Sequence, residues 1–172
     1  MTSILKVDNL QDASGTGSPY IKGAVLQVVP QTVSGTLANI SSTSYHSSGL
    51  TLSITPSSTN SKILLSFFSS IFNPAGGFVN VSIHRNITSS TSGNTQVSGG
   101  TNLDTSTANY GLSHGYSQTG SQIAPCAVTI LDSPSSTSTQ TYTVTYKSSS
   151  GSSVNVFANG QIASLIAQEI GG

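Results

Sequence analysis

The sequence predicts an all-β protein, an antiparallel β-sandwich or jelly roll with a short extended attachment segment at its N-terminus. Three observations support this fold class. Val, Ile, Thr, Tyr and Phe gather in short blocks, Ser, Gly, Asn and Pro separate the blocks, and several blocks alternate apolar with polar residues. Such alternation is typical of a strand with one buried and one hydrated face.

Nine blocks are predicted to be strands, and turn-forming residues bound each of them. These blocks are 24–29, 50–55, 62–72, 78–84, 110–116, 123–131, 141–146, 154–158 and 162–170. The alternation is clearest at Val79, Val81 and Ile83, where Asn80 and Ser82 point the other way. A series of short strands with polar connections favours a two-sheet sandwich.

Two of the blocks, 62–72 and 162–170, also fit helical spacing, because periodicity alone cannot assign a short apolar run. Strands are favoured because serines interrupt the first block and glycines bracket the second. A helix from Ile162 to Ile170 is the alternative. Both blocks carry apolar residues on both faces, such as Leu165 beside Ile166, which predicts central or interface strands.

The chain is predicted to have two parts, an N-terminal attachment segment at residues 1–22 and a β-sandwich body at residues 23–172. The first part holds four of the ten charged residues and ends in a loop rich in turn formers. The body contains a long polar connection at about 86–109, and connections of this length are often functional.

Charge and composition exclude several classes of protein. Only 6% of the residues are charged, and five scattered Lys and Arg residues cannot form the basic stripe that nucleic acid binding needs. No apolar run approaches the length of a membrane helix, and the N-terminus lacks the features of a secretory signal. We therefore expect a protein made in a cytoplasm, without membrane insertion. Its net charge of zero favours association.

Two stretches of the chain carry recognisable motifs. The first is SILKVDNLQDASGTG followed by SPYIKGAVLQVV, and the second is SITPSSTNSKILLSFFSSIF at Ser53–Phe72. Both stretches resemble segments of the tail-fibre-like and virion structural proteins of marine phages, including phages of cyanobacteria. The order of the blocks, with ASLIAQEI in the last one, is similar to trimeric jelly rolls of the tumour-necrosis-factor and complement-head type. The resemblance implies a homotrimer located in the virion, and it carries over no cofactor, metal or catalytic residue.

On this interpretation the chain is a phage virion structural protein, a homotrimeric tail-fibre or fibre-head component. The N-terminal segment would attach it to other virion proteins, through Leu5, Val7, Asn9, Leu10 and Asp12. The body would contribute to adsorption to host-surface polysaccharide through uncharged donors, acceptors and aromatic rings. The residues expected on this loop surface are Asn94, Gln96, Asn102, Asp104, Asn109, Tyr110 and Tyr116. The alternative is a capsid decoration or cement protein that stabilises the shell.

Catalysis is not predicted, because the body has few titratable residues and lacks a G-x-S-x-G motif. Asp104 and Asp132 are expected to be turn formers, although their convergence would permit glycan hydrolysis. The three histidines lack metal-ligand spacing, so only a metal shared on a trimer axis is an alternative. His84 is expected to cap a strand at the surface, and Cys126 to be a small buried apolar residue.

Overall fold

The computed structural model describes residues 23–35, 39–73, 77–106, 110–117, 120–157 and 160–172, and these form ten strands. The strands are β1 (Val25–Val33), β2 (His46–Ile54), β3 (Lys62–Asn73), β4 (Gly77–Arg85), β5 (Thr101–Asn102), β6 (Ser113–Ser117), β7 (Gln122–Asp132), β8 (Gln140–Ser148), β9 (Asn155–Val156) and β10 (Ala163–Ile170). None of the described segments is a helix long and apolar enough to cross a bilayer.

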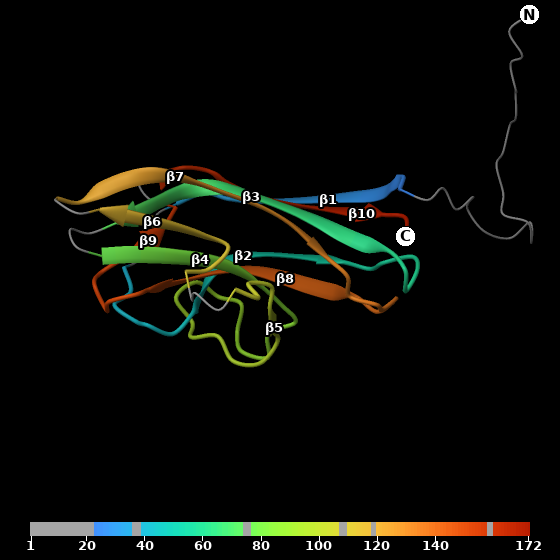
Figure 1. Cartoon of the computed structure of the whole chain (residues 1–172), viewed down its shortest axis with the longest axis horizontal. Coiled ribbons are helices and arrows are strands. Elements are labelled where there is room, and N and C mark those ends of the chain that lie inside the picture. The colour runs from blue at the N-terminus through green and yellow to red at the C-terminus, as the bar shows by residue number, and fades with distance from the viewer. Residues whose placement is uncertain (1–22, 36–38, 74–76, 107–109, 118–119, 158–159) are drawn as a thin grey trace, which may run out of the picture.

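The strands form two antiparallel sheets packed face to face, so the predicted all-β sandwich is confirmed (Figure 1). One sheet has the order β1-β10-β3-β7, with β9 beside β3. The other has the order β2-β8-β4, with β5 and β6 both paired to β4. The chain passes between the sheets from β1 to β2, β3 and β4, and again from β6 to β7, β8 and β10. This strand order is that of a jelly roll.

Most predicted strands are confirmed within a few residues of their expected ends. Residues 163–170 form a strand rather than a helix, and both β10 and β3 are central strands, as expected. The strand expected from Tyr110 begins only at Ser113, because Gly111 adopts a φ of +74°, which extended backbone does not have. β9 ends before Phe157, whose φ of +62° is left-handed. The two-residue strand β5 lies in the long polar connection and was not predicted.

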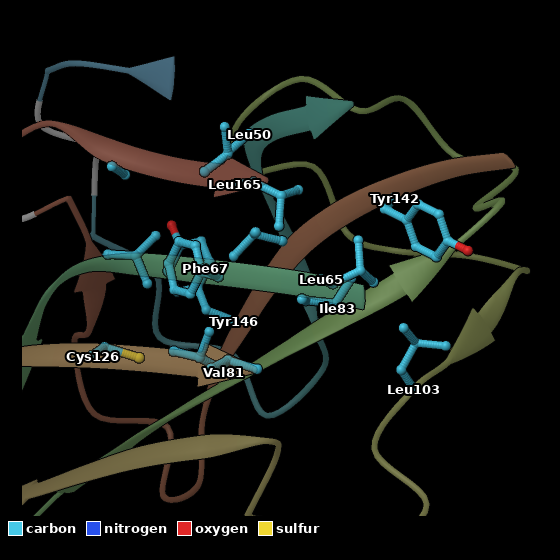
Figure 2. Packing of buried hydrophobic residues seen from close by; sticks show 14 of the residues in the cluster. Leu50, Leu65, Phe67, Val81, Ile83, Leu103, Cys126, Tyr142, Tyr146 and Leu165 are labelled. Carbon is cyan, nitrogen blue, oxygen red and sulfur yellow. The ribbon is translucent and has the colours of Figure 1, made fainter. Parts of the chain in front are cut away.

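The hydrophobic core fills the space between the two sheets. β3 contributes Leu65 and Phe67, while β4 contributes Val81 and Ile83 (Figure 2). Alternate residues of each strand point inward, which is why Tyr142, Val144 and Tyr146 of β8 are all buried. Cys126 of β7 is buried among them as expected, and burial raises the pKa of its thiol. Burial of one such large side chain contributes about 2 kcal/mol to folding.

The outer face of the β2-β8-β4 sheet is polar along β2 and β8, and the chain that follows β4 partly covers it. Hydroxyl pairs connect β2 and its extension to β8, at Thr51–Thr143, Ser53–Thr141 and Thr55–Thr139. The connection after β4 folds back over this face, where Figure 1 shows its loops around β5. Its backbone is tied to β2 by hydrogen bonds from the Ser47 amide to Thr95 and from the Asn94 amide to Ser47.

The prediction for His84 was wrong. His84 does not cap a strand at the surface, since it is only 7% exposed. Its Nδ1 lies 2.8 Å from the Thr145 hydroxyl, and its ring meets the edge of Tyr45 at a centroid distance of 5.1 Å. Burial lowers the pKa of His84 to about 4, so the ring is neutral near pH 7.

Two acidic side chains are held inside the sandwich by specific partners. Asp132 at the end of β7 forms an ion pair with Arg85 of β4 at 2.6 Å and accepts a hydrogen bond from the Tyr142 hydroxyl at 2.7 Å. This triad joins the two sheets. Glu169 of β10 is 1% exposed and accepts hydrogen bonds from Gln27 and from the amide and hydroxyl of Ser57.

Candidate functional site

An aromatic cluster on the outer face of the β2-β8-β4 sheet is the best candidate for a binding site. It consists of Phe78 on β4, Tyr110 before β6, and His114 and Tyr116 on β6. The β4–β6 register places Phe78 opposite Tyr116 and Asn80 opposite His114. The inward residues of β4 are Val79 and Val81, so Phe78 belongs to the outer face of its sheet.

The four rings lie against one another and remain accessible. Phe78 stacks on Tyr116 with centroids 4.4 Å apart and an interplanar angle of 26°. Tyr110 lies 5.8 Å from Phe78 and 5.2 Å from His114, in tilted arrangements. The side chains of Tyr110 and Tyr116 are nevertheless 46% and 49% exposed. Paired rings lose little conformational freedom on binding a ligand, because their mutual contacts already fix them.

Two glycines bring this cluster together. Gly111 has a φ of +74°, and a Cβ at this position would lie 2.4 Å from the Val81 carbonyl oxygen. A side chain is therefore excluded where the chain turns from Tyr110 into β6. Gly115 lies between His114 and Tyr116 on the inward side, where a Cβ would lie 2.6 Å from Ile71. Its lack of a side chain lets β6 approach the opposite sheet while the two flanking rings face outward.

The cluster can bind an uncharged ligand that has an apolar face and a polar edge. The half-buried Phe78 ring and the exposed Tyr rings offer flat apolar surfaces, and the Tyr hydroxyls add polar groups at the rim. A sugar ring has this character, with C–H groups on one face and hydroxyls around its edge. Arg85 and Asp132 are engaged with each other inside the sandwich, so their charges are already paired.

The structure divides the sequence-predicted binding residues into two groups. Tyr110 and Tyr116 belong to the aromatic cluster. Asn94, Gln96, Asn102 and Asp104 belong instead to the connection that covers the sheet nearer the other end of β4, where β5 pairs with His84 and Arg85. The predicted set therefore does not form one continuous site. Asn109 and the attachment residues Leu5, Val7, Asn9, Leu10 and Asp12 lie outside the described residues.

Three members of the second group hold the connection in place. Asn94 accepts a hydrogen bond from the Tyr146 hydroxyl. Asn102 accepts from the Ser82 hydroxyl and from the Asp104 amide, and Asp104 in turn accepts from the Ser106 amide at 2.9 Å. Gln96 is exposed and connects to β2 through its backbone, opposite His46. The side chains of Asn94, Asn102 and Asp104 are therefore used for hydrogen bonds that stabilise the connection, rather than for contacts with a ligand.

Sequence reasoning missed Phe78 and His114 as members of the site. Alternation in the block 78–84 already placed Phe78 on the face opposite Val79, where an exposed aromatic residue is unusual. His114 and Tyr116 are two residues apart and therefore share a strand face. These two signals indicated exposed rings, but only the β4–β6 register shows that the rings meet.

Asp104 and Asp132 are not combined into one site. Asp132 is paired with Arg85, whereas Asp104 caps a turn at Ser106, so each carboxylate has a separate partner. The nearby Asp104 carboxylate and, above all, burial raise the pKa of Tyr45 to about 12. In the part of the chain that the structure describes, no three His, Cys, Asp or Glu side chains gather as a metal-binding group.

Comparisons with known proteins identify no family for this chain. No protein-family profile matches the sequence. No curated protein matches it either. Among solved structures, a chain in the structure of the infectious bursal disease virus Gx strain aligns over 98% of this chain and 42% of its own length. Its TM-score is 0.30 and its sequence identity is 12%, a likeness too distant to assign a family. This chain spans about two fifths of the length of that viral chain.

Proposed function

We propose that this chain is a phage virion structural protein, a homotrimeric tail-fibre or fibre-head component that binds host-surface glycans. The exposed aromatic cluster is the observation that carries the binding role, because Tyr110 and Tyr116 are about half exposed although their rings are apolar. The low charge of the chain and the two stretches that resemble phage virion proteins support the structural role.

Binding would depend on packing of a sugar ring against the paired rings of Phe78 and Tyr116. A single shallow site of this kind gives weak binding, because it buries little surface. Three such sites on one trimer can engage a repetitive polysaccharide together, and the linked sites then bind far more tightly than one. Such a trimer would bind the host polysaccharide tightly although none of its sites is a deep pocket.

The glycan-binding role is tested with an array of bacterial O-antigens and capsular polysaccharides. The chain should bind a subset of the array, and Tyr116→Ala should weaken the affinity per site about tenfold, since an aromatic contact contributes about 1.4 kcal/mol. Thr137→Ala is the matched control, because Thr137 is exposed in the β7–β8 connection at the opposite end of the sandwich. Equal binding by Tyr116→Ala and the wild type would refute the role of the cluster.

The location in the virion is tested by the number of copies per particle. A tail-fibre component should be present in tens of copies or fewer, measured by quantitative mass spectrometry of purified particles against the major capsid protein. A count in the hundreds would refute the tail-fibre assignment and would favour the decoration protein. This measurement does not depend on glycan binding, so the two parts of the proposal can fail separately.

A further inference from the structure

The outer face of the β1-β10-β3-β7 sheet carries most of the exposed large hydrophobic side chains. Nine large hydrophobic side chains are exposed in the described part of the chain, and seven of them lie on strands of this sheet or immediately before β10. Val28 of β1, Phe68 of β3 and Leu131 of β7 are examples. The other two are the tyrosines of the aromatic cluster.

The strand register places apolar side chains of neighbouring strands close together, with a few polar residues between them. Leu64 of β3 lies opposite Leu131 on one side and opposite Gln168 of β10 on the other. On the same face, Ile166 of β10 lies between Ser66 of β3 and Pro30 of β1. Apolar side chains therefore extend across all four strands. Phe68 on the central strand β3 is 56% exposed, and Leu131 near the end of the edge strand β7 is 49% exposed.

The two outer faces of the sandwich are thus different. The β2-β8-β4 sheet presents pairs of Thr and Ser hydroxyls and is partly covered by the connection after β4. The β1-β10-β3-β7 sheet presents mostly Val, Leu, Ile, Phe and Pro side chains, with polar residues such as Gln168, Ser66 and Thr129 among them. A predominantly apolar face of this size on a folded domain marks an interaction surface.

The size of the face suits an interface between subunits. With about 3.3 Å per residue along a strand and about 4.8 Å between strands, four strands of this length cover a footprint of about 600 Å². A stable interface buries about 800 Å² of accessible surface on each partner, and side chains raise the accessible area above the flat footprint. The face alone therefore approaches the area that a stable complex needs.

The charge of the face identifies its partner. Within the described strands, alternation places one charged side chain on this face, Lys62 at the beginning of β3. Three such faces can meet around a threefold axis without burying a large number of like charges, because each brings only Lys62. The chain's own segment 1–22 is a poorer match, because it carries four of the ten charged residues and covering the face with it would desolvate them.

We propose that copies of this chain associate through the outer face of the β1-β10-β3-β7 sheet, with Phe68 and Leu131 at the contact. This inference deepens the proposed homotrimer, on which it rests, by naming the surface that its subunits share. The glycan-binding cluster belongs to the other sheet and stays exposed in the assembly. The trimer therefore presents three aromatic clusters, one from each subunit, and the subunit contact covers none of them.

The test compares the solution mass of variants of the full chain by light scattering on a sizing column. The wild type should have three times the chain mass of 17.5 kDa. The double variant Phe68→Lys, Leu131→Lys should dissociate, with the association midpoint raised at least about thirtyfold, because charges are then buried at the centre of the contact. Ser53→Lys is the matched control, since Ser53 is exposed on β2 of the other sheet, and it should keep the wild-type mass.

A second measurement applies even if the double variant fails to fold. A photo-crosslinking phenylalanine analogue at position 68 should join two chains and double the mass on a denaturing gel, whereas the same residue at position 53 should not. A crosslink from position 68 to residues 1–22 of the same chain would overturn the proposal, as would the absence of any crosslink. A trimer whose mass is unchanged in the double variant would overturn the assigned face and leave the homotrimer standing.

Discussion

Lowering the pH from 7 to 5 should destabilise the protein through His84. The folded environment lowers the pKa of this side chain from 6.5 to about 4, because the ring is buried between Tyr45 and Thr145. The unfolded chain therefore binds a proton in a range where the folded chain does not. The contribution of neutral His84 to the free energy of unfolding is complete above about pH 6.5 and is lost as the pH falls toward 4.

The size of the effect follows from the two pKa values. Protonation linkage between pH 7 and pH 5 gives a loss of about 2 kcal/mol in the free energy of unfolding, and the full loss below pH 4 is about 3 kcal/mol. Urea unfolding at the two pH values measures it directly. His84→Gln keeps an amide that can donate to Thr145 but does not titrate, so its stability should change much less between pH 7 and pH 5.

The control is His114→Gln, because His114 is exposed and its replacement leaves the buried His84 unchanged. The reasoning is refuted if the wild type and His84→Gln lose the same free energy between pH 7 and pH 5. Such a result would mean that the neutral state of the buried ring does not control acid stability.

Four further predictions concern other residues of the fold. Burial alone would raise the pKa of Glu169, but hydrogen bonds from Ser57 and Gln27 lower it, so its stabilisation is full above about pH 4.5 and lost at lower pH. Glu169→Gln should therefore cost about 2 kcal/mol at pH 7 and less in acid, and an equal loss in urea unfolding at both pH values would contradict this. Arg85→Ala leaves the buried Asp132 charge without its ion pair and should cost about 3 kcal/mol, whereas unchanged stability would argue that the pair is dispensable. Cys126 should not react with a thiol reagent until the chain unfolds, and rapid labelling of the native protein would show that it is accessible. Gly111→Ala should lower both the melting temperature and glycan binding, because its Cβ would meet the Val81 carbonyl, and wild-type values for both would refute that clash.

The fold class could be predicted because turn residues and β-branched residues alternate so regularly along the chain. The helix-or-strand ambiguity of 62–72 and 162–170 had a physical cause. Inward residues such as Phe67 and Leu165 are apolar, but so are the outward residues Phe68 and Ile166. An apolar outer face removes the period of two that distinguishes a half-buried strand. The same feature that obscured the secondary structure indicates the subunit contact proposed for the protein.

The site was harder to predict, because it depends on which strands become neighbours. Tyr110 and Tyr116 were candidates from their residue type alone. Their contact with Phe78 depends on the pairing of β4 with β6, which are separated by the long connection. The burial of His84 likewise depends on that connection folding back, and the local sequence around His84 and Arg85 is typical of a surface strand end. Short-range patterns do not contain these long-range contacts.

The position of β10 has a consequence for how the chain folds. β1 pairs with β10 and with no other described strand. Val25 is paired with Ile170, although nearly the whole sequence of the domain separates the two residues. Closing so long a loop is entropically unfavourable, and proteins dominated by such distant pairings fold slowly. Until β10 enters the sheet, β3 presents an unpaired edge beside its apolar face, and such edges promote aggregation. Slow refolding with transient aggregation is therefore expected from this strand order itself.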